Sequence, residues 1–186
     1  MKQLISEEKV IGGVKKAIVE TLGIEESSIT PESSLMKDLG AESLDFLDIN
    51  YRLEQAFGIK MARHSLIEHI EEMFGEDSAV DADGQLTDQA VKLLAIRFGD
   101  SLPQSAAGLD MDEVPNIITV QSIANAVMDI LHTLPEQCPA CGKSAWTADG
   151  DTRIKCDACG EPGNYTNGDD LARQWLTQVQ EEKHIF

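Results

Sequence analysis

Apolar residues recur at helical spacing along most of the chain, so the pattern predicts a mainly helical protein. The first predicted helix begins near Ser6 and ends at Gly23, with acidic residues at its positive end. The second runs from Ser43 to Phe57 and is stopped by Gly58. Five residues form its apolar stripe: Phe46, Ile49, Leu53, Ala56 and Phe57.

More helices are expected in the middle and at the end of the chain. They cover residues 64–74, residues 87–98 behind a capping threonine, a segment that opens at Thr119 or Ser122, and residues 169–179. The pattern therefore predicts helices from the first to the last third of the chain.

The helix over residues 43–57 also carries residues that fall outside its apolar stripe. They are both apolar and acidic: Leu44, Asp45, Leu47, Asp48, Tyr51 and Glu54. A mixed stripe of this kind is typical of a docking face for a partner. The alternative is an ordinary solvated face with a few stray apolar residues.

The chain has 186 residues and a formal net charge of −18, with the acidic residues spread along its length. Such a charge disfavours binding to nucleic acid and anionic membranes and favours basic partner surfaces. The alternative is that the charge only maintains solubility. The first eight residues lack the apolar run of a signal peptide, and no stretch approaches about 18 apolar residues. We therefore expect a cytoplasmic protein without a membrane span.

The four cysteines form two Cys-x2-Cys pairs separated by 14 residues: Cys138, Cys141, Cys156 and Cys159. Each pair can present two thiolates from one turn, and two such turns complete a closed tetrahedral site for structural zinc. Short strands at 144–147 and 152–155 are expected between the pairs. The pattern resembles a zinc ribbon, and two disulfides or a rubredoxin-like iron site are the alternatives.

Four thiolates fill a tetrahedral shell, so no further ligand is expected from the histidines. We assign ordinary roles to all four: His64, His69, His132 and His184.

The segment Asp38–Leu44 reads Asp-Leu-Gly-Ala-Glu-Ser-Leu and brings Ser43 to the start of the second helix. No histidine lies close in sequence, and no Gly-x-Ser-x-Gly elbow surrounds the serine. Ser43 is therefore expected to be modified rather than to attack a substrate. The alternative for the serine alone is a simple helix N-cap.

This segment closely resembles the Asp-Leu-Gly-Ala-Asp-Ser-Leu signature of acyl carrier proteins, with Glu42 in place of the usual aspartate. The resemblance covers about residues 5–65 and 115–133, where Asn116–Ile123 looks like the start of the family's final helix. It implies that Ser43 carries a 4′-phosphopantetheine arm, whose thiol holds acyl groups as thioesters.

The expected fold is all-α: an acyl-carrier-like four-helix bundle over residues 1–134, interrupted by an insertion of about residues 69–114 that contains a helix. A small zinc-ribbon module with a closing helix follows over residues 135–186. The resemblance also implies a carrier rather than an enzyme, and we expect a monomer.

By family analogy, five residues would meet partner enzymes: Leu44, Asp45, Leu47, Asp48 and Glu54. The implied partners are a phosphopantetheinyl transferase and then acyl-loading, condensing or acyltransferase enzymes with basic docking surfaces, in lipid or secondary-metabolite synthesis. One alternative is an interaction adaptor that never carries an arm. Another is nucleic-acid binding through the ribbon, which the acidic residues there disfavour.

Overall fold

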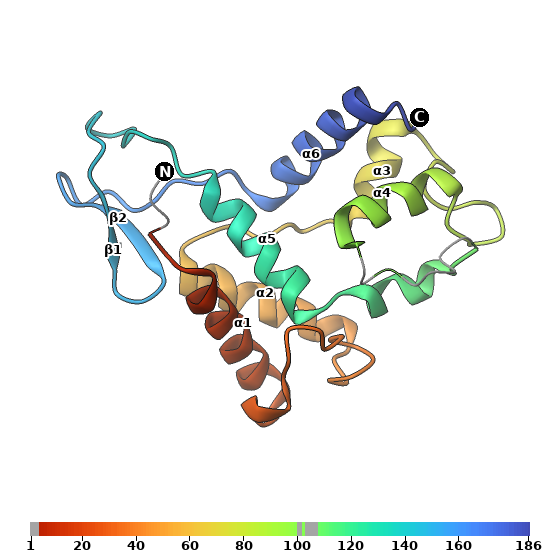
Figure 1. The fold of residues 1–186 in the computed structure, drawn as a ribbon, viewed down its shortest axis with the longest axis horizontal. Coiled ribbons are helices and arrows are strands. Elements are labelled where there is room, and N and C mark those ends of the chain that lie inside the picture. The colour runs from red at the N-terminus through yellow and green to blue at the C-terminus, as the bar shows by residue number, and fades with distance from the viewer. Residues whose placement is uncertain (1–3, 100–101, 103–107) are drawn as a thin grey trace.

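The computed structural model describes residues 4–99, 102 and 108–186, and it is mainly helical, as the apolar periodicity predicts (Figure 1). Two short strands accompany the helices. The helices are α1 (Glu7–Leu22), α2 (Ser43–Phe57), α3 (Leu66–Phe74), α4 (Asp88–Phe98), α5 (Val120–His132) and α6 (Gly168–Lys183), with 3-10 turns at Glu26–Ser28 and Met111–Ile117. The strands are β1 (Trp146–Asp149) and β2 (Arg153–Cys156).

The first two helices end where the sequence predicts. The Ser6 hydroxyl caps α1 by accepting a hydrogen bond from the Lys9 N–H, and Gly23 ends the helix at φ +67°. Helix α2 has the predicted bounds, and Gly58 ends it at φ +70°. Only glycine adopts this left-handed conformation without strain, which explains why both stops are visible in the sequence.

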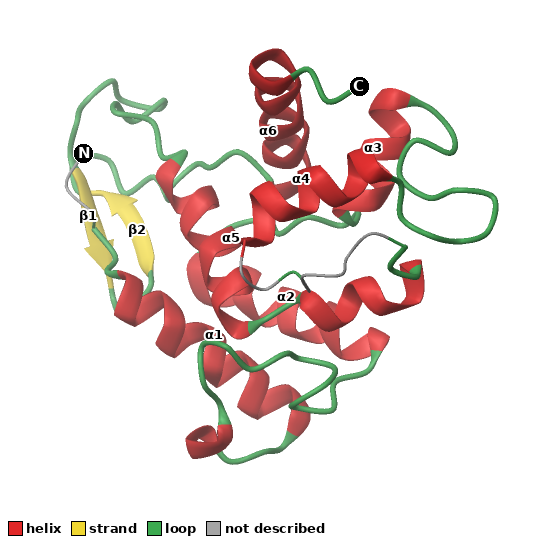
Figure 2. Ribbon diagram, turned by 45° about the vertical axis from the view of Figure 1, so that its right-hand side comes forward, coloured by secondary structure: helices red, strands yellow, loops and turns green. Residues whose placement is uncertain are grey.

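The main core forms where α1 packs against both α2 and α5 (Figure 2). Each helix contributes a buried apolar face. From α1 and α2 these are Val10, Val14, Ala17, Ile18, Ile49, Leu53 and Phe57, and from α5 they are Val120, Ile123, Ala124, Val127, Ile130 and Leu131. Helix α5 is thus part of the bundle although it begins more than 60 positions after α2 ends.

The loop before α2 holds the start of α5 in place. Leu35 N–H donates to the Ile118 carbonyl at 3.0 Å, and Val120 N–H donates to the Ser33 carbonyl at 3.1 Å. Of the two predicted start positions, Thr119 is the N-cap, because its hydroxyl accepts from the Ser122 N–H at 3.1 Å. These contacts close the bundle across the intervening segment.

A second core lies on the other side of the molecule, where α3 and α4 pack with α6 (Figure 1). Its buried residues include Ile67, Ile70, Ala90, Leu93, Leu94, Leu176 and Val179. Part of the predicted insertion, residues 100–101 and 103–107, lies outside the described residues. Helix α6 is longer than the predicted 169–179 because Glu181, Glu182 and Lys183 continue it without an apolar signal.

The two strands form an antiparallel hairpin that is shifted by one or two residues from the predicted positions. Trp146 pairs with Cys156, and Asp149 pairs with Arg153 around the turn at Gly150. Ile154 of β2 is buried in the main core. The segment 135–186 therefore contributes to both cores, through Ile154 and through α6, so contacts cross the predicted boundary at residue 134. The boundary itself stays a prediction.

The described residues include no helix with the length and apolar character that a membrane crossing requires.

Gly168 provides a test of how α6 docks. Its N–H donates to the Lys60 carbonyl at 2.9 Å, and a Cβ atom at this position would collide with the backbone of Ala62. We expect Gly168→Ala to lower the free energy of unfolding by about 1–3 kcal/mol, because backbone must move to admit the methyl group.

The matched control is Gly12→Ala in α1, where nothing lies within 4 Å of the added Cβ. That change should raise the free energy of unfolding by about 0.4–1 kcal/mol through helix propensity and a less flexible unfolded chain. Urea unfolding of the two variants measures both values. Equal effects at the two glycines would contradict the docking geometry.

Candidate functional site

The turn before α2 presents Ser43 from a hydrogen-bonded loop. The Asp38 carboxylate accepts from the Ser34 N–H at 2.8 Å, and Ala41 N–H donates to the Leu35 carbonyl at 2.9 Å. Gly40 turns the chain at φ +72°. Ala41 is buried, whereas the next residues are exposed, so the loop is anchored on the core directly before the serine.

Ser43 is the first residue of α2, and Glu42 is its N-cap. The Glu42 N–H donates to the Asp45 carboxylate at 2.7 Å, and the Asp45 N–H donates to the Glu42 carbonyl at 2.9 Å. The N-cap alternative for Ser43 is therefore wrong. Ser43 is exposed, and its hydroxyl makes no hydrogen bond to any described residue.

The position of Ser43 suits a phosphodiester. The first N–H groups of a helix lack partners within the helix, and the helix dipole places partial positive charge there. Both effects stabilise an attached anion. The Ser43 hydroxyl is also exposed, so a bulky phosphate donor has room to approach it.

The apolar part of the predicted docking face is exposed. Leu44 is 76% exposed, Leu47 56% and Tyr51 57%. These three residues are among the most exposed large apolar side chains in the described part of the chain. Exposed apolar area of this kind is a feature of a contact surface, and here it lies beside an exposed serine.

The predicted acidic residues on α2 have different surroundings. Asp48 accepts from Arg52 at 2.8 Å and from Thr21 at 2.8 Å, and Arg52 also pairs with Glu20 at 2.8 Å. The Arg52 guanidinium, and then the Thr21 hydroxyl, lower the pKa of Asp48 below its usual value. Asp48 therefore stays charged but already has partners, while Asp45 holds the capping box.

The inclusion of Glu54 in the docking face is wrong. Its side chain is buried and binds the segment that follows α2, accepting from the Met61 N–H at 3.0 Å and from Arg63 at 2.9 Å. Lys60 lies 3.6 Å away. Position 54 borders the apolar stripe, and the chain after α2 folds back over it. Helical periodicity contains no information about that return.

The four cysteines meet at one point. The Sγ atoms of Cys138 and Cys159 lie 3.7 Å apart, as do those of Cys141 and Cys156, and one ligand atom of each lies within 4.8 Å of the others. In a tetrahedron with Zn–S bonds of 2.3 Å, the sulfur atoms are separated by about 3.8 Å. A disulfide requires about 2.05 Å. The cysteines are free, so this geometry fits a four-thiolate metal site and not two disulfides.

Both cysteine turns have the same backbone geometry. Gly142 N–H donates to the Cys138 carbonyl at 2.8 Å, and Gly160 N–H donates to the Cys156 carbonyl at 2.7 Å.

Burial raises the pKa of Cys156, but the Ala158 N–H and neighbouring thiols bring it down to about 7. The hydrogen bond from the Glu161 N–H lowers the pKa of Cys159. Burial and the other thiols outweigh it and raise that pKa to about 12. The cluster thus favours some thiolate near neutral pH.

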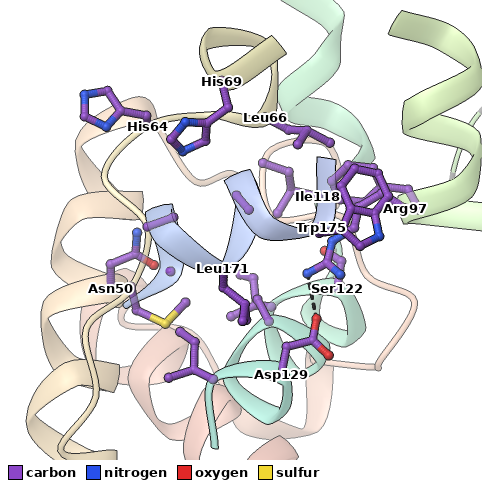
Figure 3. Close-up of a pocket in the computed structure, with 18 of the residues that line it drawn as sticks. Asn50, His64, Leu66, His69, Arg97, Ile118, Ser122, Asp129, Leu171 and Trp175 are labelled. Atoms are coloured by element: carbon purple, nitrogen blue, oxygen red, sulfur yellow. Dashed lines mark ion pairs between the residues drawn. The ribbon is translucent and has the colours of Figure 1, made fainter. Parts of the chain in front are cut away.

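A cavity of about 460 Å³ lies between α2, α5 and α6 (Figure 3). Its walls are mainly apolar and include Ile118, Leu171 and Trp175, with Arg97 paired to Asp129 at 2.8 Å on one side. The lining comes from segments that are far apart in the sequence. For this reason no single motif could have predicted the cavity.

The structure also brings together three residues that the sequence left unassigned. The side chains of His64 and His69 both approach the carboxylate of Asp169 in α6, about 100 positions later. No sequence spacing connects such distant residues. The assignment of ordinary roles to both histidines stays a prediction, but the structure shows that they share one carboxylate partner.

Comparisons with known proteins relate part of this chain to one family. The family described as phosphopantetheine attachment site matches residues 13–80, a range that contains Ser43. The acyl carrier protein of Thermotoga maritima is 43% identical to the chain over 58 residues, which is 31% of this chain and 72% of that relative. No solved structure shows a significant match.

This chain belongs to the acyl carrier protein family, and it is a carrier rather than an enzyme. The family match runs through α3 to residue 80, beyond the expected limit near residue 65, and does not include α5.

The buried position of Glu54 gives a stability prediction. Glu54→Ala should lower the free energy of unfolding by about 1–3 kcal/mol, because the Met61 N–H loses its acceptor. The adjacent exposed residue offers the control, since Gln55→Ala should change stability by less than about 0.5 kcal/mol. Urea unfolding of both variants measures the difference. A neutral Glu54→Ala would show that the buried contact is not required.

Proposed function

We propose that this protein carries acyl groups as thioesters on a 4′-phosphopantetheine arm attached to Ser43. The observation that carries the proposal is an exposed serine hydroxyl, free of hydrogen bonds to described residues, at the positive end of α2. The family match over residues 13–80 supports the same assignment.

Attachment would join the Ser43 Oγ atom to the phosphorus of the phosphopantetheinyl group of coenzyme A. The Oγ–P bond forms as the bond to the departing adenosine bisphosphate breaks. The serine proton must be removed by the transferase, because no histidine lies close in the sequence and the exposed hydroxyl has no basic partner among the described residues. The N-terminus of α2 then stabilises the negative phosphodiester.

The cavity is the proposed shelter for acyl cargo. Phe46 and Asn50 line it, and they follow Ser43 by three and seven positions on one face of α2. An arm leaving Ser43 could therefore lie along this face towards the cavity. Its volume of about 460 Å³ is in the range of small-ligand pockets, and its walls are mainly apolar.

The proposed partners are a phosphopantetheinyl transferase and acyl-loading, condensing or acyltransferase enzymes of lipid or secondary-metabolite synthesis in the cytoplasm. Support comes from the exposed face of Leu44, Leu47 and Tyr51, with Asp45 and Asp48 beside it, and from the net charge of −18. The apolar residues would supply contact area, and the charge would speed the approach of basic surfaces. Glu54 is not part of this face.

The four cysteines are proposed to hold structural zinc in a ribbon that braces the bundle. The hairpin between the two cysteine pairs contacts α2, where Thr152 donates to the Ala56 carbonyl at 2.7 Å. Four protein thiolates leave no open coordination position, which argues for a structural role. We retain a bundle over residues 1–134, with an insertion of about 69–114, and a ribbon module over 135–186 as the proposed organisation.

The arm can be tested directly by intact mass. Incubation with coenzyme A and a broad-specificity phosphopantetheinyl transferase should add one phosphopantetheinyl group to the wild-type chain. Ser43→Ala should add none, whereas Ser27→Ala, which removes another exposed serine hydroxyl, should behave like the wild type. An unmodified wild-type chain would favour the alternative of an interaction adaptor without an arm.

The zinc site can be tested by its thiols. Reaction of the four cysteines with a mercurial should release one equivalent of zinc, detected with a colorimetric chelator, because the metal is held only by sulfur. Cys141→Ser should weaken zinc retention. Red protein containing iron, or a mercurial reaction of all four thiols that releases no zinc, would overturn the assignment.

A further inference from the structure

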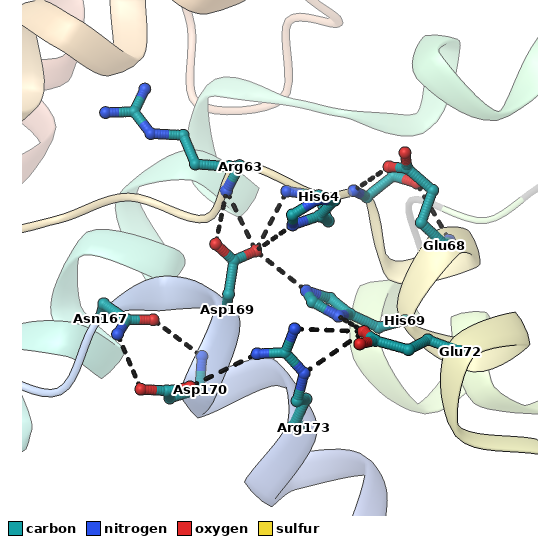
Figure 4. A network of polar contacts seen from close by, with 10 residues as sticks. Arg63, His64, Glu68, His69, Glu72, Asn167, Asp169, Asp170 and Arg173 are labelled. Carbon is teal, nitrogen blue, oxygen red and sulfur yellow. Dashed lines mark hydrogen bonds and ion pairs between the residues drawn. The ribbon is translucent and has the colours of Figure 1, made fainter.

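Three potential metal ligands from two distant segments meet at one point (Figure 4). His64 precedes α3, His69 lies within α3, and Asp169 lies in the first turn of α6. The Asp169 Oδ1 atom is 3.0 Å from the His69 Nε2 atom and 3.4 Å from the His64 Nδ1 atom. One ligand atom of each residue lies within 4.8 Å of the others.

We propose that His64, His69 and Asp169 bind a divalent transition-metal ion of the zinc type. Imidazole nitrogen and carboxylate oxygen bind zinc at about 2.0–2.2 Å, so neighbouring ligand atoms in a tetrahedral shell are separated by about 3.3–3.5 Å. The separations of 3.0 and 3.4 Å are close to that range. The ligands differ from the four thiolates, so the two sites are chemically distinct.

The surroundings of His69 support the assignment. Its side chain is fully buried between two carboxylates, with Nε2 towards Asp169 and Nδ1 3.5 Å from the Glu72 Oε2 atom. In the described part of the chain, His69 Nδ1 is a buried atom without a hydrogen-bond partner. A neutral imidazole carries one proton, so its other nitrogen must direct a lone pair at a carboxylate.

A metal ion removes this unfavourable contact between an imidazole lone pair and a carboxylate. With the ion on Nε2, the proton stays on Nδ1 and faces Glu72. A carboxylate behind a metal-bound histidine is the usual outer contact of such sites, because it holds the ring and its tautomer. Glu72 is itself held by Arg173 at 3.1 Å (Figure 4).

Asp169 is oriented for the same role. Its carboxylate accepts from the Arg63 N–H at 3.0 Å and from the His64 N–H at 3.0 Å, so the backbone before α3 holds it in place. An ionised carboxylate has about four acceptor positions, which leaves electron pairs for an ion. The metal would then join α3 to α6.

The site borders the cavity, because His64 and His69 are among the lining residues. Three protein ligands leave one tetrahedral position, and water from the cavity can occupy it. Leu171 of α6 lines the same cavity one turn after Asp169. Fixing α6 would therefore fix one wall of the cavity.

Cobalt(II) titration of the full-length chain tests the proposal. The cysteine site is first filled with one equivalent of zinc, and cobalt is then added. We expect one further equivalent to bind and to give d–d absorption without the strong sulfur-to-cobalt charge-transfer band. Ser43→Ala should give the same result, so failure of the arm assignment and failure of this site are separable.

Variants identify the ligands. His64→Ala should lower the affinity for the second cobalt ion by at least about 100-fold, and Glu72→Gln should lower it by about 10- to 100-fold. His64 has a 57% exposed side chain, so its removal should not prevent folding, which circular dichroism checks. His132→Ala, another exposed histidine, should leave binding unchanged.

The proposal is overturned if the wild-type chain binds no second equivalent, or if His64→Ala binds it as tightly as the wild type. In the first case the cluster only anchors α6 through the contacts of Asp169 with the segment that begins α3. A charge-transfer band in the second equivalent would place the cobalt on the cysteines, which also overturns it.

Discussion

The rest of the structure depends on the burial of the apolar face of α5 against α1 and α2. Helix α5 has the most buried face in the bundle, yet it follows a long intervening segment. Its start is held by the backbone bonds of Ser33 and Leu35, directly before the turn that presents Ser43. The same contact therefore completes the core and orders the loop that leads to the serine. A helix with an apolar face of this size cannot remain uncovered in water.

Because α5 packs in the bundle, the segment before it is excluded from the main core. That segment buries its own apolar residues elsewhere. Helices α3 and α4 do so with α6, the last helix of the chain. The molecule thus has two cores, and the cavity and the His64, His69 and Asp169 cluster lie where elements of both meet. On the bundle, the exposed serine and the exposed α2 side chains Leu44, Leu47 and Tyr51 remain accessible. The proposed attachment site lies at the start of α2, and the cavity proposed for cargo is lined by α2 together with α5 and α6.

Local rules predicted the elements with good accuracy because the signals are local. Ser6 and Gly23 bound α1, Gly58 ends α2, and the cysteine spacing brings four thiolates together. Glu54 was misplaced because the chain that covers it returns from beyond the end of α2. Helix α6 was predicted too short because polar residues extend it without periodicity. Only the error at Glu54 arises from a contact between distant segments that overrides the local pattern.

The sequence by itself determined the helices, the serine at the start of α2 and the two cysteine pairs, because caps, periodicity and ligand spacing act over a few residues. That Glu42, not Ser43, caps α2 is a local contact with Asp45, which the structure was needed to show. Only the tertiary structure decided that Glu54 is buried. It alone brought Asp169 to His64 and His69 across about 100 positions. Such contacts are chosen by the packing of whole helices, and no spacing within one segment encodes them.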